Sequence, residues 1–360
     1  MANPNLQFKF PKTSSIHGFT NLTPRSWSKI SFSSIEKVID FVPIEKILHR
    51  LYKHVGRLPY SKLALFKAIL LQRLEGWQFD TVLAKKLREI EEYRRFCGFK
   101  KGRTPSHDTI SRFKRVLPTK MLDQIFFKLD TALAALGTFK EDDLAIDATE
   151  LVTYSNSFKR TDSEAGIGHK SDKRHFHGYW ELLTVGTKSE MIRLPPLTSP
   201  GDKHQILQMK ELLSDLLRHT HLKYTHILAD GIFDTQEIQQ IILDDLKKVP
   251  VIRYNPKQSK FKRLEELPHG NWRFFNPLLA DIPAFHKKYN ERTAIERFNG
   301  RLKDGTSIRR SNVRGLQMNP KFVYVGVITL QLITLTLQYL MNNIQKLGQR
   351  SLKKYSGGFH

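Results

Sequence analysis

Leu144-Ala145-Ile146-Asp147-Ala148-Thr149 is the stretch that decides the fold class of this 360-residue chain. It is typical of a short buried strand, because its apolar run is interrupted by one aspartate near the end. The pattern returns in residues 224–230, where Asp230 ends an apolar run, and residues 249–254 form a further apolar segment. Strands of this kind that alternate with helical segments predict an α/β domain.

The segments around these strands complete the expected order. Residues 179–185 and 191–194 are predicted strands, residues 155–175 a polar loop, and residues 205–217 and 235–246 helices. The order is then three strands, helix, strand, helix, strand and a last helix that carries Glu296. This order fits an RNase H-like domain, a mixed sheet flanked by helices whose acidic residues gather at the carboxyl side of the sheet.

The N-terminal part of the chain has helical periodicity instead. Helices are predicted over residues 62–74, from residue 79 or 80 to residue 90, and from the N-cap candidate Ser106 onwards. A basic connection precedes Ser106, and the cations assigned to DNA here are Lys100, Lys101, Arg103 and Arg112. Helices joined by short basic turns are compatible with a helix-turn-helix DNA reader, and an ordinary helical domain with solvated lysines is the alternative.

These patterns predict four regions. Residues 1–40 are expected to be a flexible basic arm and residues 41–138 an all-helical DNA-binding domain. Residues 139–345 are the expected catalytic domain, with a small insertion near 257–285, and residues 346–360 a basic tail.

Charge is distributed unevenly along the chain, whose formal net charge is +24. Residues 1–130 carry 25 Lys/Arg against 11 Asp/Glu, residues 131–300 carry 24 against 23, and residues 301–360 carry 10 against 1. A neutral middle between basic ends indicates a catalytic body with phosphate-binding arms. The charge pattern therefore favours nucleic acid as the partner, with acidic membrane surfaces as the alternative.

Cysteine usage and apolar segments bear on the compartment. Cys97 is the only cysteine, so no intrachain disulfide is possible and a reducing, cytoplasmic location is expected. The N-terminus lacks the apolar core of a secretory signal. Residues 323–341 nearly reach bilayer-spanning length, but glutamines and threonines interrupt them, which favours a buried helix over a membrane span.

Three carboxylates stand out as candidate metal ligands. Asp147 and Asp230 lie at or near strand ends, where an aspartate alone is more often a turn former or helix cap. On the helix predicted over residues 289–303, Glu296 shares a face with cations. Two divalent ions about 3.5–4 Å apart, bound by such acids, can activate a nucleophile and relieve charge on a leaving oxygen. Mg²⁺ prefers these oxygen ligands, and Mn²⁺ is an expected substitute.

The run Tyr289, Arg292, Glu296 and Lys303, with two, three and six residues between them, resembles the Tyr-Arg-Glu-Lys signature of bacterial DDE insertion-sequence transposases. Residues 145–149 and 229–234 look like the first and second acid motifs of that family. The resemblance extends over residues 50–345. Gly-Ile-Phe at residues 231–233 departs from it, because many relatives have a Lys-Gly-Tyr-like run there.

The resemblance implies roles for these residues. Asp147, Asp230 and Glu296 are expected to be the catalytic carboxylates. Tyr289, Arg292 and Lys303 are then expected to hold the transposon end, although ion pairs on the helix surface are the alternative for the two cations. The implied partners are double-stranded DNA, as inverted-repeat ends and target, and further copies of the chain in a dimer or higher assembly on DNA. A location on the bacterial nucleoid follows.

Other residues have two interpretations each. The loop of residues 307–315 contains Arg309, Arg310 and Arg314, which are expected to meet the DNA backbone unless they are simply solvated. The aromatic residues of 272–275 can stack on a flipped base, but packing within the insertion is favoured. A zinc site at His175 and His177 is disfavoured because no third ligand is evident, and Asp234 is expected to cap a helix.

The expected activity is metal-dependent cleavage at transposon ends and transfer of the freed 3′-hydroxyl into target DNA. A catalytically silent DNA-binding protein derived from a transposase is one alternative. An RNase H-like nuclease without strand transfer is the other.

Overall fold

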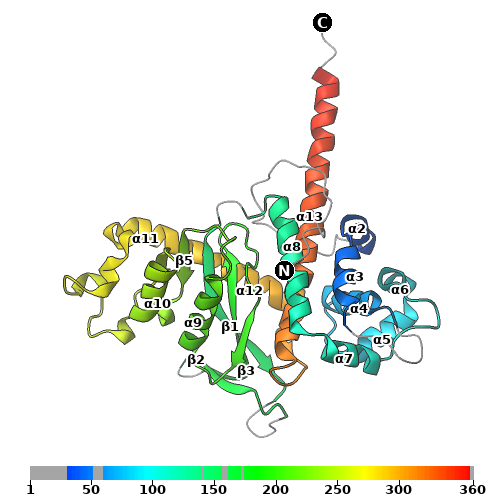
Figure 1. Cartoon of the computed structure of the whole chain (residues 1–360), viewed down its shortest axis with the longest axis horizontal. Coiled ribbons are helices and arrows are strands. Elements are labelled where there is room, and N and C mark those ends of the chain that lie inside the picture. Colours follow the sequence, from blue (N-terminus) through cyan, green and yellow to red (C-terminus); the bar gives the residue numbers. More distant parts are fainter. Residues whose placement is uncertain (1–30, 52–59, 140–141, 156–160, 172–173, 357–360) are drawn as a thin grey trace. The chain divides into compact units, whose positions relative to one another are not determined.

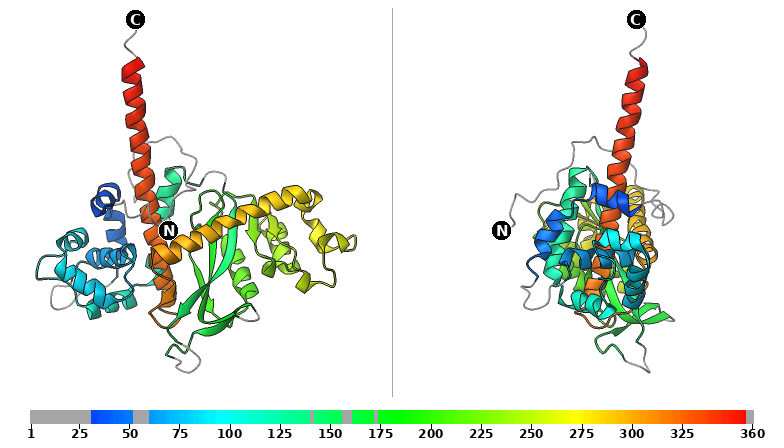
Figure 2. Two further views of the ribbon diagram at one scale, coloured as in Figure 1. Left: turned by 180° about the vertical axis from the view of Figure 1, so that it is seen from behind. Right: turned by 90° about the vertical axis from the view of Figure 1, so that its right-hand side faces the viewer.

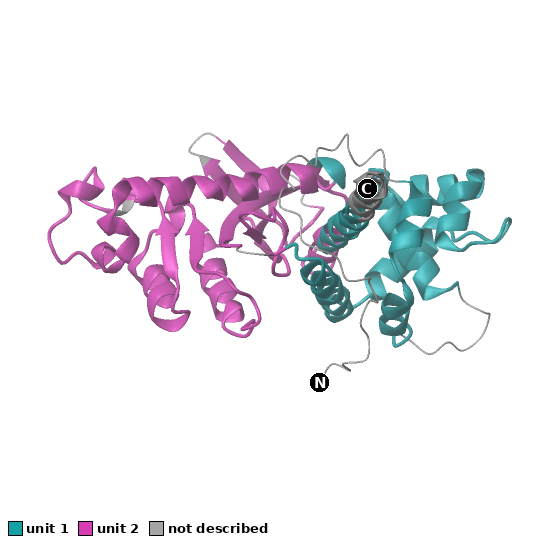
Figure 3. Cartoon of the chain, turned by 90° about the horizontal axis from the view of Figure 1, so that it is seen from above, with its two compact units in different colours: residues 1–138, 304–307, 324–360 teal, residues 139–303, 308–323 magenta. Residues whose placement is uncertain are grey.

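The computed structural model describes residues 31–51, 60–139, 142–155, 161–171 and 174–356 (Figure 1). The chain divides into two compact units (Figure 3). The helical unit comprises residues 1–138, 304–307 and 324–360, and the sheet-containing unit comprises residues 139–303 and 308–323.

Helices joined by short connections make up the helical unit in its described residues. Ser61 caps α4 by accepting a hydrogen bond from the Ala64 N–H, and Ser106 caps α7 in the same way through Thr109. The start of α7 at Ser106 is therefore confirmed. The helices are α2 (Phe32–Val38), α3 (Val42–Leu48), α4 (Lys62–Leu74), α5 (Asp80–Glu89), α6 (Glu91–Cys97), α7 (His107–Val116), α8 (Thr119–Ala135) and most of α13 (Asn319–Ser356).

Helix α2 lies within the segment that we expected to be a flexible arm. Ser31 caps this helix, Ile35 and Val38 are buried, and the Phe32 ring lies 5.0 Å from the Phe96 ring between centroids. The arm is thus ordered from residue 31 because its apolar face has α6 to pack against. Residues 1–30, the rest of that arm, lie outside the described residues.

Helix α13 joins the helical unit from Tyr324 onwards, not the sheet-containing unit as the boundary at residue 345 implied. The Tyr324 ring stacks on Phe126 of α8 at 6.0 Å, and its hydroxyl donates to Asp123 at 2.6 Å. Within the described residues, Asn319–Asn342 is the one helix long and apolar enough to cross a membrane, and most of it is buried inside the protein. The side chains of residues 343–356 lie outside what is described, so the expected basic tail stays a prediction.

A mixed sheet organises the second unit. Its main path runs β2-β3-β1-β5-β6, with β4 beside β3 and β7 beside β1. β3 is antiparallel to β1, β2 and β4, whereas β5 runs parallel to β1 and β6. This order confirms the expected RNase H-like α/β class. The strands are β1 (Leu144–Thr153), β2 (Gly166–Ser171), β3 (Arg174–Gly186), β4 (Leu197–Pro200), β5 (His226–Ala229), β6 (Val249–Ile252) and β7 (Arg310–Ser311).

Three strand predictions need correction. β1 continues past the short segment expected, because it pairs with β3 from Leu144 to Val152. β2 lies inside the supposed polar loop of residues 155–175, since the hairpin with β3 satisfies its backbone. Residues 191–194 make only a bridge between Ile192 and Val185, and the strand at that edge is β4.

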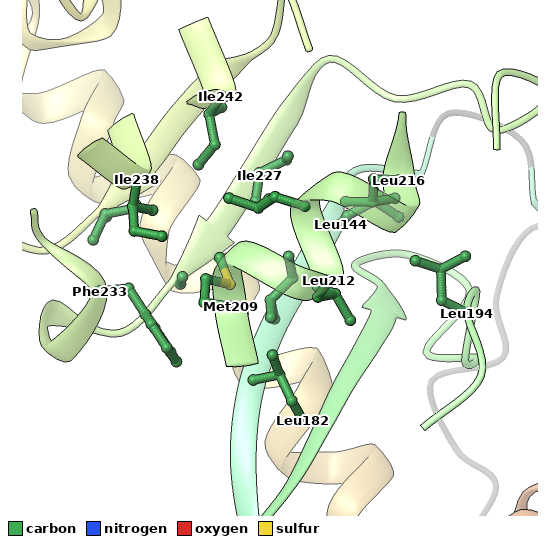
Figure 4. Packing of buried hydrophobic residues seen from close by; sticks show 14 of the residues in the cluster. Leu144, Leu182, Leu194, Met209, Leu212, Leu216, Ile227, Phe233, Ile238 and Ile242 are labelled. Carbon is green, nitrogen blue, oxygen red and sulfur yellow. The ribbon is translucent and has the colours of Figure 1, made fainter. Parts of the chain in front are cut away.

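Helices cover both faces of the sheet. In Figure 1 α9 (Gln205–Leu216) and α10 (Gln236–Gln240) lie in front of it, and the reverse view in Figure 2 brings forward α11 (Ile282–Tyr289) and α12 (Thr293–Gly305). α10 ends in a wider π turn over Ile241–Asp245. The core between α9, α10 and the sheet is closely packed apolar side chains (Figure 4). Its strand residues include Leu144, Ile146, Leu182, Ile227, Ala229 and Ile252.

The insertion between β6 and α11 consists of short 3₁₀ turns: η3 (Pro256–Gln258), η4 (Leu264–Glu266), η5 (Trp272–Phe275) and η6 (Pro277–Ala280). It is anchored by Arg273, which donates to the buried Asp234 carboxylate at 2.9 Å. Phe275 is 72% exposed and Phe274 41% exposed, so the interpretation that these rings pack the insertion is wrong for both.

Candidate active site

Asp147 and Asp230 lie side by side on neighbouring parallel strands. The register pairs Ile146 with Ala229, so the next step along each strand brings Asp147 beside Asp230. Ile146 and Ala229 belong to the core under α9 and α10, and side chains alternate along a strand. Asp147 therefore faces the opposite side, toward α12. It lies inside β1 rather than near its end, whereas Asp230 directly follows β5 as expected.

The turn after β5 requires a glycine. The Asp230 carboxylate accepts a hydrogen bond from the Gly231 N–H at 2.8 Å, which directs the chain into a 3₁₀ turn, η1 (Gly231–Phe233). A Cβ at Gly231 would lie 3.0 Å from the Arg253 carbonyl oxygen, so a larger residue would push the turn away from β6.

The signature residues occupy three elements instead of one continuous helix. Tyr289 ends α11, Arg292 ends the 3₁₀ turn η7 (Asn290–Arg292), and Glu296 and Lys303 lie on α12. The apolar stripe expected on α12 is confirmed, because its three members are buried: Ile295, Phe298 and Leu302. The turn η7 that precedes α12 contacts both β1 and β5, which bear Asp147 and lead into Asp230.

Arg292 bridges two of the three candidate carboxylates. Its Nη1 lies 3.5 Å from Asp147 Oδ2, and its Nη2 donates to Glu296 Oε1 at 2.8 Å. The second contact is the helix-surface pair that we considered as an alternative. The Glu296 side chain is 55% exposed, so this pair is worth only about 0.3–0.5 kcal/mol.

Charge is unbalanced at this position. Three carboxylates surround one guanidinium, and the charges of Asp230 and Glu296 both act on Asp147. Burial, opposed by Arg292 and reinforced by these two acids, raises the pKa of Asp147 to about 6. The three carboxylates together with Arg292 therefore keep a net negative charge, which favours the binding of a further cation.

The positions of these acids bear on the predicted metal site. Among the described residues, no three His, Cys, Asp or Glu side chains are grouped closely enough to hold a metal ion. Asp147 and Glu296 instead converge on the Arg292 guanidinium. Carboxylate oxygens are the donors that Mg²⁺ prefers, so the residues fit the ion in chemistry and charge, with the guanidinium between them.

Tyr289 and Lys303 flank this group in different ways. The Tyr289 ring centroid lies 5.7 Å from Arg292 Cζ, and burial raises the pKa of its hydroxyl. The Lys303 Nζ lies 3.0 Å from Glu150 Oε1, and Lys170 pairs with the other oxygen of Glu150 at 2.8 Å. Lys303 is thus paired with a carboxylate of β1, and not with Glu291 or Glu296 on the helix surface as the ion-pair alternative had it.

Glu190 is a buried partner of α12 that the sequence did not reveal. It is 1% exposed and has φ 50°, a left-handed conformation that is unusual for a residue other than glycine. Its carboxylate accepts from Arg297 Nε at 2.6 Å and from Arg301 Nη1 at 2.5 Å, and its carbonyl accepts from Arg301 Nη2 at 2.7 Å. These bonds tie α12 to Glu190 at the residue after Glu296 and again four residues further on. No motif around Glu190 signals this role.

Two other interpretations are resolved by the contacts. Thr235 caps α10, so the prediction that Asp234 is the cap is wrong; Asp234 is the buried partner of Arg273. His175 packs edge-on against His169 at 4.5 Å, and the zinc alternative has no ligand group in the described part of the chain.

The remaining predicted DNA contacts are all exposed. Lys100, Lys101 and Arg103 form a tight turn closed by a hydrogen bond from the Arg103 N–H to the Lys100 carbonyl. Arg112 lies on the exposed side of α7. In the sheet-containing unit, Arg309, Arg310 and Arg314 are also exposed, and Arg310 stacks over the Tyr154 ring at 4.1 Å.

Comparison with known proteins gives two family matches. Residues 26–116 match the model described as transposase domain (DUF772), and residues 138–332 match the transposase DDE domain. Among solved structures, a piggyBac transposase synaptic complex with hairpin DNA matches with 11% identity and a TM-score of 0.41, covering 88% of this chain and 76% of that chain. No curated protein matched. Because the DDE model spans more than half of its residues, the chain belongs to the DDE transposase family.

Proposed function

We propose that this transposase cleaves DNA at the ends of its element and joins the freed 3′-hydroxyl to target DNA. The observation that supports the proposal is that the charges of Asp230 and Glu296 both act on Asp147, and that Arg292 links Asp147 on β1 to Glu296 on α12. Neighbouring acids with a net negative charge suit divalent cations, and the basic surfaces of the protein suit DNA.

The three carboxylates would hold two Mg²⁺ ions, or Mn²⁺ in their place. When bound, such ions lower the pKa of a nucleophilic water and stabilise the leaving oxygen. Asp147 and Asp230 are fixed by the sheet, so they supply the rigid part of the site. Glu296 approaches from α12, whose orientation depends on Glu190. Tyr289 and Arg292 lie beside the acids and would orient the phosphate of the transposon end.

DNA binding would use both units. The turn of Lys100, Lys101 and Arg103 with Arg112 offers phosphate contacts ahead of and along α7, and the arginines of residues 309–314 offer others. Joining two ends implies a dimer or larger assembly on DNA, acting at the bacterial nucleoid.

A cleavage and strand-transfer assay tests the proposal. The full-length protein is incubated with Mg²⁺ and DNA that carries the sequences flanking its gene, beside Glu296→Gln and the control Glu211→Gln on the exposed face of α9. We expect nicking and joined products from the wild type and the control. Glu296→Gln should lose both while it still binds DNA.

Other results would point elsewhere. Tight DNA binding without chemistry from any of the three proteins would indicate a silent DNA-binding protein. Cleavage without joined products would indicate a nuclease.

A further inference from the structure

We propose that Arg292 is an exchangeable counter-ion: it neutralises the carboxylates in the metal-free protein and is released to a DNA phosphate when a divalent cation takes its place. The inference rests on the proposed function of the same site. It assigns to one side chain a coupling between metal binding and DNA binding.

The contacts place the guanidinium where a metal would have to bind. Arg292 reaches Asp147 on β1 at 3.5 Å and Glu296 on α12 at 2.8 Å, two acids from elements far apart in sequence. The negative charge of Asp230 also acts on Arg292. A divalent cation bound by these oxygens would lie close to the Arg292 guanidinium, and the two positive charges would repel each other. Both cannot occupy the position.

The existing contacts are weak enough to exchange. The longer one is at the limit of a hydrogen bond, and the shorter one involves a half-exposed glutamate. One positive charge against three carboxylates leaves the group under-neutralised, so a doubly charged ion is the better partner.

Once displaced from the carboxylates, the Arg292 guanidinium can bind a DNA phosphate. Its side chain is 17% exposed, and the Tyr289 ring, at 5.7 Å from Cζ, limits its movement on one side. A guanidinium released beside bound metal ions would meet the phosphate that those ions also contact, and it can bind that phosphate through two parallel hydrogen bonds. Metal and DNA would then each increase the affinity for the other, as linkage requires.

Arg292→Met tests the exchange, because methionine retains much of the side-chain bulk without the charge. Arg218→Met is the matched control, since it removes one cation from a 77% exposed side chain just after the end of α9. Mn²⁺ binding to each full-length protein, without DNA, is measured by electron paramagnetic resonance. We expect Arg292→Met to bind Mn²⁺ about tenfold more tightly than the wild type and the control.

A second measurement follows the released arginine. Binding of a fluorescent random-sequence duplex is measured with and without Ca²⁺. We expect Ca²⁺ to strengthen DNA binding by the wild type and by Arg218→Met several-fold more than by Arg292→Met, which keeps only the direct contact of the metal with the phosphate; an equal gain in all three proteins would overturn the release of Arg292.

The outcomes separate the two proposals. If the wild type binds Mn²⁺ and Asp147→Asn does not, but Arg292→Met binds no more tightly than the wild type, the exchange is overturned and the metal site stands. If neither the wild type nor Arg292→Met binds Mn²⁺, the metal site itself is rejected, and the exchange with it.

Discussion

Asp230 and Asp234 lie four residues apart in one loop, yet their surroundings are opposite. Asp230 is exposed beside Asp147, whereas Asp234 is 1% exposed and bound by Arg273, Gln239 and the Asn255 N–H. A carboxylate that serves a reaction must stay accessible, and one that anchors an insertion must be desolvated and paired.

We therefore expect opposite effects from removing each acid. Asp230→Asn should lose Mg²⁺-dependent cleavage with little change in stability, because its charge lies among other acids. Asp234→Ala should cost about 3–5 kcal/mol, because it leaves Arg273 buried without its partner. Urea unfolding and the cleavage assay on both variants check this. Equal stability of Asp234→Ala and the wild type would contradict the anchoring role.

Glu181 on β3 predicts a pH dependence of stability. It is fully buried, it accepts one hydrogen bond from Thr198 at 2.8 Å, and burial raises its pKa to about 8 from an ordinary 4.5. Between these values the folded protein holds a proton that the unfolded chain releases. This residue's contribution to stability therefore falls as pH rises from 4.5 to about 8.

Glu181→Gln should abolish this fall in stability with rising pH, since glutamine keeps the shape of the side chain without a titrating proton. The free energy of unfolding of the variant should match that of the wild type near pH 5. Above this pH it should exceed the wild-type value by at most about 1.4 kcal/mol per pH unit. Urea unfolding across this pH range measures the difference. A constant difference between the two proteins would refute the assignment.

At the scale of elements, α12 shows how a surface-charged helix acquires a fixed orientation. Its apolar stripe buries Ile295, Phe298 and Leu302, which sets the face that points into the protein. Glu190 adds a second attachment by accepting hydrogen bonds from Arg297 and Arg301 on successive turns. The left-handed backbone at Glu190 is the strained feature that brings its carboxylate there.

Glu190→Gln should therefore destabilise the sheet-containing unit by about 3 kcal/mol and weaken Mn²⁺ binding, because Glu296 loses its fixed position. Glu237→Gln is the matched control: its pair with Lys210 is exposed, so its loss should cost less than about 1 kcal/mol. Unfolding curves and Mn²⁺ titrations test both. A loss of stability without any change in Mn²⁺ affinity would limit Glu190 to a structural role.

At the scale of the whole molecule, the formal charge of +24 means that affinity for DNA depends on salt concentration as well as on individual contacts. Binding to phosphates releases counter-ions, so affinity falls with salt concentration in proportion to the number of contacts. The exposed cations of the turn before α7 are the contacts that we propose for DNA.

Replacing Lys100, Lys101 and Arg103 by serine should weaken duplex binding at all sequences and reduce the salt slope by up to about 3, because each phosphate contact contributes about 0.9. A control that removes three exposed charges elsewhere, from Lys203, Arg218 and Lys223, should change the slope less. Fluorescence anisotropy over a salt series measures this. Equal slopes for the two triple variants would show that only net charge matters.

The sequence by itself determined the α/β class, the helical N-terminal region, the α7 cap and the apolar stripe of α12, because local apolar spacing and capping chemistry fix such features. It also named the three acids, since acids on apolar runs and the signature spacing are visible without coordinates. Only the tertiary structure decided their surroundings. Strand register brought Asp147 beside Asp230, and long-range pairing gave Arg292, Lys303 and Asp234 their partners. Such contacts join residues distant in sequence, so no local pattern encodes them.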